Sequence, residues 1–512
     1  MPLLLYRAAR PLLFTSLLLA TLCLPVFFYL RGPALDTVFS SDLQLPASQH
    51  WNLLHRPWGW FTFQQPRVDS LFPDQFVYHL LAFVLADPRQ VTLTYAVISL
   101  GAFYALGGLC AARLAQTAVL PSALAVAALF NVAATAAHLT GRTYIAYDLM
   151  MMPVTHSGPF LMSLGLFLLR GRRRAEMIIA FAGCVCDPLF LVYGVIPLLG
   201  SAVLAERPAS LRALEAAASP HLRTLIIALA GYLLPGLMFI QKTYNQTFAE
   251  WSANDALMWH DLLRPEINAI MLVPALAYLG LLAARAWRGR LDAGRLFIMT
   301  ALAAPIPLFV YFYHDDTCVR YLLPLYVWPL IALAAALVRA FRTVVTIVAA
   351  LSLAAGSAMA AAAGQFAAPI LSWRLPIEAC IDRLAPEAGL RAGLAAYDLA
   401  RPVSVSSGFR RQVEQVNVIG QPYLWGNDPY WYTHDIARPA EPAPFNFIVM
   451  AKLHSPSILA AYGAPDRTYG CPGSEIWVYD RPGHVLDILV AASATGNVDL
   501  RRDANNHAVS AR

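Results

Sequence analysis

The chain has 512 residues, of which 58% are hydrophobic and 13% are charged, and its formal net charge is +6. Its mean hydropathy is +0.54. A soluble globular domain has about a quarter charged residues, so this composition excludes a soluble protein and predicts a polytopic membrane protein. The arginines are scattered between apolar runs instead of forming one basic stripe, which argues against nucleic-acid binding and indicates membrane topology.

A helix that crosses a bilayer needs roughly 17 to 25 mostly apolar residues. Runs of this kind occupy 11–30, 91–112, 118–137, 156–170, 189–205, 222–241, 265–285, 294–312, 320–338 and 343–364. The apolar stretch 175–205 is too long for one span and is interrupted at Asp187-Pro188. It predicts a hairpin in which a short helix, 175–187, precedes the next span, so that the bundle has about eleven transmembrane helices.

Arginine clusters lie at every second boundary between these runs, which places the N-terminus in the cytoplasm and the C-terminal part outside. The apolar segment 71–86, within the first outer loop 31–90, is expected to lie at the outer membrane interface. If 71–86 crossed the membrane, the orientation of every later loop would be reversed. Arg172 to Arg174 would then lie outside, against the preference of arginines for the cytoplasmic side. The run 11–30 could be a signal peptide, but its apolar core exceeds the usual 7 to 15 residues and favours an uncleaved anchor.

The composition changes near residue 370, where apolar runs shorten and turn residues multiply. The stretches "RPVSVSS", "FNFIVMAKL" and "EIWVYD" alternate as β-strands do, and "SPSILAAYGAP" is typical of a helix. The sequence therefore predicts a transmembrane domain over 1–365, a small outward-facing α/β domain over 370–490 and a disordered polar tail over 491–512.

Two of the seven cysteines, Cys380 and Cys471, fall in the C-terminal domain. If that domain faces an oxidising periplasm, a disulfide between them is expected, and two independent buried thiols are the alternative. The remaining five cysteines lie in or beside membrane helices and are expected to be small core residues.

Ionisable groups at membrane boundaries are costly and therefore informative. On the predicted outer side they are Asp42, Arg142, Asp148, His156, Asp187, His314, Asp315, Asp316 and Arg320. Such a cluster could bind a phosphate-bearing headgroup and supply a base. The alternatives are ordinary: a solvated loop for Asp148 and His156, a wet turn for 314–316, a helix cap at Asp187 and a snorkelling side chain at Arg320.

The order of elements resembles the GT-C superfamily, the integral-membrane glycosyltransferases that use polyprenyl-phosphate sugars. The features that carry the resemblance are an N-terminal anchor, an outer loop with an early acid ("FSSDLQLP"), the interfacial "FPDQFVYHLLAFVLA", the basic-flanked hairpin "RGRRRAEMIIAFAGCVCDPLFLVYGVIPLL", the helix "RYLLPLYVWPL" and a C-terminal outer domain. It covers roughly 1–365. Within this group the chain is most similar to bacterial members of uncharacterised activity.

The resemblance implies that Asp42 is the catalytic base or orients the acceptor, and that Arg320 stabilises the departing lipid phosphate. Arg142, Asp187, His314, Asp315 and Asp316 are expected to contact the substrates. Many members have a paired acid in the first loop, whereas here Asp42 follows a serine. Whether the acids hold Mg²⁺ or Mn²⁺ stays open, since spacing does not show that they converge.

These features predict a glycosyltransferase of the bacterial inner membrane that moves a hexose or pentose from a polyprenyl-phosphate donor to a lipid or glycan acceptor of the envelope, without nucleic acid. The aromatic segment "QPYLWGNDPYWYTHDIARP" could offer stacking surfaces for a glycan, or it could be a loop packed by its own rings. Two alternatives remain open: a transporter or flippase, and a catalytically inactive assembly partner on the same scaffold.

Overall fold

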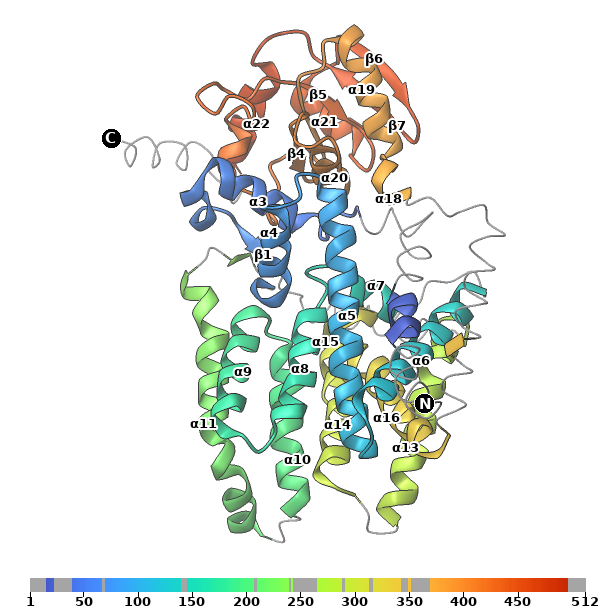
Figure 1. Cartoon of the computed structure of the whole chain (residues 1–512). Helices are drawn as coiled ribbons and strands as arrows, with labels where there is room; N and C mark the ends of the chain where they lie inside the picture. The colour runs from blue at the N-terminus through green and yellow to red at the C-terminus, as the bar shows by residue number, and fades with distance from the viewer. Residues whose placement is uncertain are drawn as a thin grey trace.

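The computed structural model describes residues 15–22, 39–66, 70–139, 145–206, 210–238, 241–242, 265–287, 291–312, 316–341, 349–350 and 369–495. The protein is mostly helical, and a five-stranded mixed α/β region follows at the C-terminus. Figure 1 shows the helices of the first part standing side by side as a bundle, with the C-terminal region at one end. That end is called the domain end below.

Five helical segments in the described part of the chain are long and apolar enough to cross a membrane. They lie in α5 (Pro88–Ala115), α6 (Val119–Leu139), α11 (Leu211–Met238), α14 (Ala293–Ala303) continued by α15 (Pro305–Phe312), and the end of the 3₁₀ helix η4 (Asp316–Leu322) continued by α16 (Leu323–Ala340). These helices indicate a multi-pass membrane protein, as the composition predicts.

Four further predicted spans correspond to shorter or partly described helices. They are α8 (Ser157–Leu169), α9 (Arg173–Cys186), the π-helix η3 (Leu191–Val195) continued by α10 (Ile196–Glu206), and α13 (Pro265–Trp287). The predicted hairpin break is present, because α9 ends at Cys186 and Asp187 is extended. The predicted spans 11–30 and 343–364 lie largely outside the described residues, so the count of eleven stays a prediction.

The bundle packs through large rings and small residues. Trp328 on α16 is fully buried against the rings of Phe160, Phe167 and Phe297. A Cβ added at Gly108 on α5 would lie 2.5 Å from the Cβ of Ala123 on α6. Close approach of helix backbones through small residues is how membrane helices gain contact in lipid, where the hydrophobic effect no longer drives association.

Short elements lie between the bundle and the C-terminal region, as Figure 1 shows. They are α3 (Leu45–His55), the 3₁₀ helix η1 (Pro57–Phe61), the π-helix η2 (Leu71–Gln75), α4 (Phe76–Ala82), α7 (Ile145–Met151) and the strand β1 (Gln65–Pro66), which pairs with β2 (Gln241–Lys242). Phe76, Leu80 and Phe83 are exposed on or beside α4. Such an apolar face suits the membrane interface predicted for 71–86.

The C-terminal region is one mixed sheet with helices around it. Its strands are β3 (Ala392–Ala396), β4 (Val413–Val416), β5 (Phe445–Val449), β6 (Arg467–Cys471) and β7 (Ser474–Val478), in the order β4-β3-β5-β7-β6. β3 is parallel to β4 and β5, whereas β7 is antiparallel to β5 and β6. Its helices are α18 (Pro369–Ser372), α19 (Pro376–Ala388), α20 (Tyr397–Ser406), the 3₁₀ helix η5 (Pro429–Tyr432), α21 (Ser455–Tyr462) and α22 (His484–Thr495).

Two of the three strands predicted here are present, and one prediction is wrong. β5 and β7 match "FNFIVMAKL" and "EIWVYD", but "RPVSVSS" belongs to α20. The residues 400–406 are all buried, so their alternation does not mark an inner and an outer face. The Ser406 hydroxyl donates to the Pro402 carbonyl one turn earlier (2.6 Å), a local bond that serines make within helices. The first residues of the predicted tail, 491–495, are helical, because α22 continues to Thr495, and the rest of the predicted tail lies outside the described residues.

Cys380 on α19 and Cys471 at the end of β6 are joined by a disulfide, with their Cα atoms 5.9 Å apart and a sequence separation of 91. The bond fastens a helix to the outermost strand of the sheet. Closing so long a loop restricts the unfolded chain, and removing a native disulfide typically costs a few kcal/mol.

Replacing both cysteines by serine should lower the free energy of unfolding of the C-terminal region by about 2 to 4 kcal/mol, because the unfolded chain regains the freedom of that loop. Thermal unfolding under non-reducing conditions measures the change. A reductant should destabilise the wild type by the same amount and leave the double variant unchanged. Equal melting temperatures of wild type and variant would contradict this prediction.

Candidate functional site

Asp42 lies in an exposed turn directly before α3, at the junction between the domain end and the C-terminal region. The Tyr397 hydroxyl, from the first residue of α20, donates to Asp42 Oδ1. The Ser41 hydroxyl donates to the Tyr397 carbonyl, and the Arg401 guanidinium donates to the Ser41 carbonyl. These bonds hold the turn against α20 and leave the Asp42 side chain at the surface.

Arg320 supplies positive charge at the same place. It lies in η4, directly before α16, and the charge of Asp42 acts on its guanidinium. The guanidinium carbon lies 5.4 Å from the centre of the Tyr321 ring. Within the described residues the buried Nε of Arg320 has no hydrogen-bond partner. An N–H group in this state can donate to a phosphate or carboxylate oxygen.

Asp187 forms a buried pair with His156. Its Oδ2 lies 2.7 Å from His156 Nδ1, and the two side chains are 0% and 7% exposed. Asp187 Oδ1 also accepts the Leu189 N–H (2.8 Å), so the capping role foreseen from the sequence is present beside the pair. The prediction of a solvated loop at His156 is wrong, because α8 and the hairpin enclose the ring.

A second buried acid, Asp74 in η2, lies next to this pair and feels the charge of Asp187. Its carboxylate accepts from the Tyr95 hydroxyl (2.7 Å) and the Val154 N–H (3.2 Å). Burial, partly offset by these bonds, raises the pKa of Asp74 to about 7. The sequence analysis missed Asp74, although an acid inside the apolar "LFPDQFVYHLL" is the kind of signal that marks such a group.

Tyr193 links the hairpin to the arginine. Its hydroxyl, fully buried in η3, lies 3.2 Å from the Arg320 carbonyl and 3.1 Å from the Tyr321 carbonyl. The His156 ring centre lies 5.5 Å from that of Tyr321. The structure therefore brings Asp42, Arg320 and Asp187 to one end of the bundle, where the charge of Asp42 acts on Arg320.

The side chains of the other predicted site residues are not described by the structure. Arg142, His314 and Asp315 lie outside the described residues, and Asp316 is described only as the start of η4. In the part of the chain that the structure describes, no group of three or more histidine, cysteine, aspartate or glutamate residues could hold a metal ion. Asp42 and Asp187 therefore belong to no metal-binding cluster among the described residues. Whether 314–316 take part in binding Mg²⁺ or Mn²⁺ stays open.

The aromatic segment 421–439 is mostly packed against its own region and against α3. Trp431 is buried and donates from Nε1 to Asn52 Oδ1 (2.9 Å), and Tyr432 is fully buried. The Tyr430 ring is covered by the Arg56 guanidinium at 3.8 Å and stacks on His434 at 3.7 Å. The expectation of an open glycan platform is wrong for these three rings, because Tyr430 and Trp431 pack against Arg56 and α3 and Tyr432 lies in the core of the C-terminal region.

Tyr423 is the exception in this segment. It is 38% exposed, its ring packs edge-on against Tyr397 at 5.4 Å, and Asp42 and Asp398 act on it electrostatically. An aromatic ring beside the Asp42 carboxylate is the combination of apolar face and hydrogen-bond acceptor that suits a sugar.

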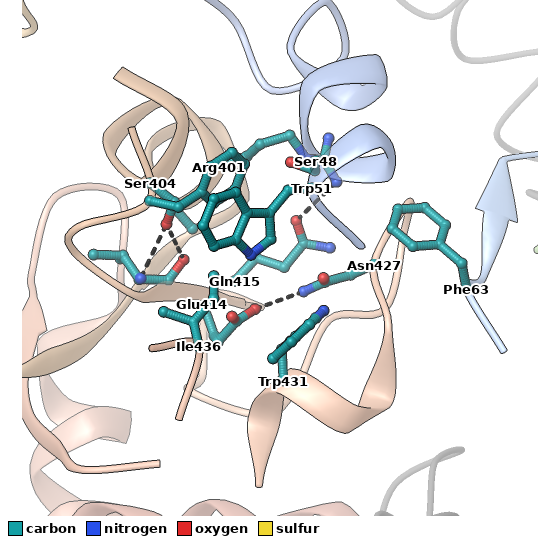
Figure 2. Close-up of a pocket in the computed structure, with 13 residues that line it drawn as sticks. Ser48, Trp51, Phe63, Arg401, Ser404, Glu414, Gln415, Asn427, Trp431 and Ile436 are labelled. Atoms are coloured by element: carbon teal, nitrogen blue, oxygen red, sulfur yellow. Dashed lines mark hydrogen bonds between the residues drawn. The ribbon is translucent and has the colours of Figure 1, made fainter. Parts of the chain in front are cut away.

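A small cavity lies where α3 meets the C-terminal region (Figure 2). Trp51, Phe63, Arg401, Glu414 and Trp431 contribute to its lining, and its volume is about 40 Å³. That is room for water molecules but not for a sugar. The cavity is therefore part of the contact between the two segments and is distinct from the Asp42 turn.

Glu414 forms a polar wall of this cavity. Its carboxylate accepts from Asn427 Nδ2 (2.8 Å), a contact drawn in Figure 2. Burial raises the pKa of Glu414 to about 7, and hydrogen bonds from Asn427 and Gln412 offset only part of that effect. The carboxyl therefore changes charge near neutral pH, inside the contact that holds the C-terminal region.

No protein-family model, no curated protein and no solved structure matches this chain.

Replacing Glu414 by glutamine should make the protein more stable at pH 8 and leave it little changed at pH 4.5. The folded-state pKa of Glu414 is raised, so its contribution is fully present below the unfolded value of about 4.5 and is lost as the pH rises through about 7. The gain at pH 8 should approach about 3 kcal/mol. Thermal unfolding between pH 4.5 and 8 measures it.

The matched control is Glu387→Gln, at an exposed position of α19. It should give the same pH profile as the wild type. If the Glu414→Gln and wild-type profiles run parallel over the whole range, the carboxyl does not titrate in the folded contact and the prediction is wrong.

Proposed function

We propose that the protein is a GT-C-like glycosyltransferase, which transfers a sugar from a polyprenyl-phosphate donor to an envelope acceptor at the domain end of the bundle. The observation that carries the proposal is the exposed Asp42 carboxylate, held on α20 and facing the charge of Arg320. In this proposal the protein lies in a bacterial inner membrane, with the domain end on the periplasmic side.

The reaction needs a base on one side of the anomeric carbon and a positive charge on the other. The acceptor hydroxyl oxygen attacks that carbon while its proton passes to the Asp42 carboxylate. The bond from the carbon to the phosphate oxygen breaks, and its electron pair stays with the lipid phosphate. Arg320, with an Nε that lacks a protein partner among the described residues, stabilises that charge. Tyr423 offers a ring beside the sugar.

A transporter or flippase is the second candidate, and one observation favours it. Asp74, Asp187 and His156 are buried at the end of the bundle, and buried ionisable groups of this kind mark proton or ion pathways in many transporters. The transferase is preferred because Asp42 is exposed at the junction with a folded outer region, where an acceptor can reach it.

The first test is mass spectrometry of envelope glycolipids and glycans from a strain that lacks the gene, complemented with wild type or with Asp42→Asn. One sugar should disappear in the deletion strain and return with wild type. Asp42→Asn keeps the shape but cannot accept the proton, so sugar transfer should fall by about 10²- to 10⁴-fold.

The matched control is Asp398→Asn, an exposed acid one residue after Tyr397 that pairs with Lys452 at 2.6 Å. It should restore the sugar fully. An unchanged glycan profile in the deletion strain would refute the transferase and favour transport. If the sugar is lost but Asp42→Asn restores it fully, Asp42 is not the base and the inactive assembly partner gains support.

A further inference from the structure

Five arginines lie at the end of the bundle away from the C-terminal region, where α13 ends and α14 begins (Figure 1). They come from five helices and are called the arginine cluster below. Its members are Arg113 in the last turn of α5, Arg170 directly after α8, Arg285 in the last turn of α13, Arg295 in the first turn of α14 and Arg339 in the last turn of α16. The sequence analysis used such arginines only to orient the chain.

Two members of the cluster share one aromatic ring. The guanidinium carbons of Arg113 and Arg170 lie 5.9 Å and 5.4 Å from the centre of the Phe167 ring, and the charge of Arg113 acts on Arg170. Arg113 donates to the Leu168 carbonyl at the end of α8. Arg170 donates to the Ala293 carbonyl at the start of α14 (2.6 Å). These bonds hold two like charges near each other instead of letting them spread into solvent.

The other three members meet around the start of α14. The charges of Arg295 and Arg339 act on Arg285. Asp292, the N-cap of α14, is 54% exposed, and its carboxylate pairs with Arg295. Its charge also acts on Arg285 and on Arg170. One carboxylate therefore connects both parts of the cluster.

Positive charge exceeds negative charge at this end of the bundle. Besides Asp292, the buried Glu176 acts on Arg170, and its carboxylate accepts the Gly171 N–H (2.6 Å). The stretches 288–290 and 342–348, which follow α13 and α16 and lie outside the described residues, add three arginines and contain neither aspartate nor glutamate. Like charges held close together repel one another. An anion from outside the chain would relieve that repulsion.

The cluster lies at the depth expected for lipid headgroups. Arg295 is near the start, and Arg339 near the end, of segments long and apolar enough to cross a membrane. Apolar side chains lie close by in sequence: Phe341 is 58% exposed, and Leu281, one turn before Arg285, is 44% exposed. Guanidinium groups beside an apolar surface can meet the headgroup and the acyl chains of the same lipid.

We propose that the arginine cluster binds the phosphodiester group of an anionic phospholipid from the membrane leaflet at this end of the bundle. A guanidinium can donate two parallel N–H groups to phosphate oxygens, and basic pockets between transmembrane helices bind acidic headgroups. The bound lipid would hold the ends of α8, α13, α14 and α16 together. The proposal does not rest on sugar transfer, since the Asp42 turn lies at the other end of the bundle.

The test uses the full chain in a neutral detergent, with phosphatidylglycerol and phosphatidylcholine as the probe lipids. Native mass spectrometry counts the lipids bound to each chain at increasing lipid concentration. Wild type should bind phosphatidylglycerol roughly tenfold more tightly than phosphatidylcholine, because several arginines contribute. Arg285→Gln and Arg339→Gln should each weaken phosphatidylglycerol binding by about fivefold and leave phosphatidylcholine binding unchanged.

The matched control is Arg174→Gln, at an exposed position in the first turn of α9 at the same end of the bundle. It removes the same charge outside the cluster and should bind phosphatidylglycerol as the wild type does. If it weakens binding as much as Arg285→Gln does, the attraction is that of a generally basic surface and the proposed site is refuted.

Two results with the wild type alone would also overturn the proposal, so it does not depend on how the variants fold. Equal affinity for the two lipids would show that the cluster does not recognise an acidic headgroup. Thermal unfolding with inorganic phosphate in place of lipid separates the two sources of phosphate. Phosphatidylglycerol should raise the melting temperature and inorganic phosphate should not; an equal rise with both would mean that the cluster takes free anions and is no lipid site.

Discussion

The arrangement of the domain end depends on one ion pair, between Arg56 just after α3 and Asp428 in the C-terminal region. Arg56 Nη1 lies 2.7 Å from Asp428 Oδ2, and the Asp428 side chain is 1% exposed. Burial alone raises the pKa of Asp428, whereas the arginine opposes that shift. Removing one partner of such a buried pair leaves an uncompensated charge, which costs about 3 to 5 kcal/mol. The pair joins α3 to the C-terminal region across a sequence separation of 372. The two segments therefore stabilise each other's position.

The candidate site follows from that attachment. Once α3 is fixed on the C-terminal region, the turn before it reaches Tyr397 and Arg401, which orient Asp42. Arg320 comes from the other side, from the bundle, so the site is assembled from three parts of the chain. Asp42 and Arg320 come from different parts of the chain, so the proposed chemistry depends on the position of the C-terminal region relative to the bundle.

Local patterns in the sequence were sufficient for much of the fold. The apolar runs locate the long helices, Asp187-Pro188 locates the hairpin break, and alternation locates β5 and β7. The failures share a physical cause, which is that contacts between distant residues decide them. "RPVSVSS" lies in α20 and is buried between the sheet strands β3 and β4 and the helices α3, α5 and α19, and His156 is buried beside Asp187 of the hairpin. For the site, the charge pattern suggested Asp42, Arg320 and Asp187, whereas Asp74 needs the packing of η2 on α5 to be recognised.

The buried acids Asp74 and Asp187 place ionisable side chains among apolar residues at the domain end. Asp187 has two hydrogen-bond partners, the His156 ring and the Leu189 N–H. Burial raises the pKa of Asp74 to about 7, and its partners within the described residues are the Tyr95 hydroxyl and the Val154 N–H. A protein gains no stability by burying a second carboxyl that could be an apolar residue. A buried carboxyl such as Asp74 suits a function in which a proton is taken up or released at the domain end. Both proposed functions involve such a step: deprotonation of an acceptor hydroxyl in a transferase, or movement of a proton with the substrate in a transporter.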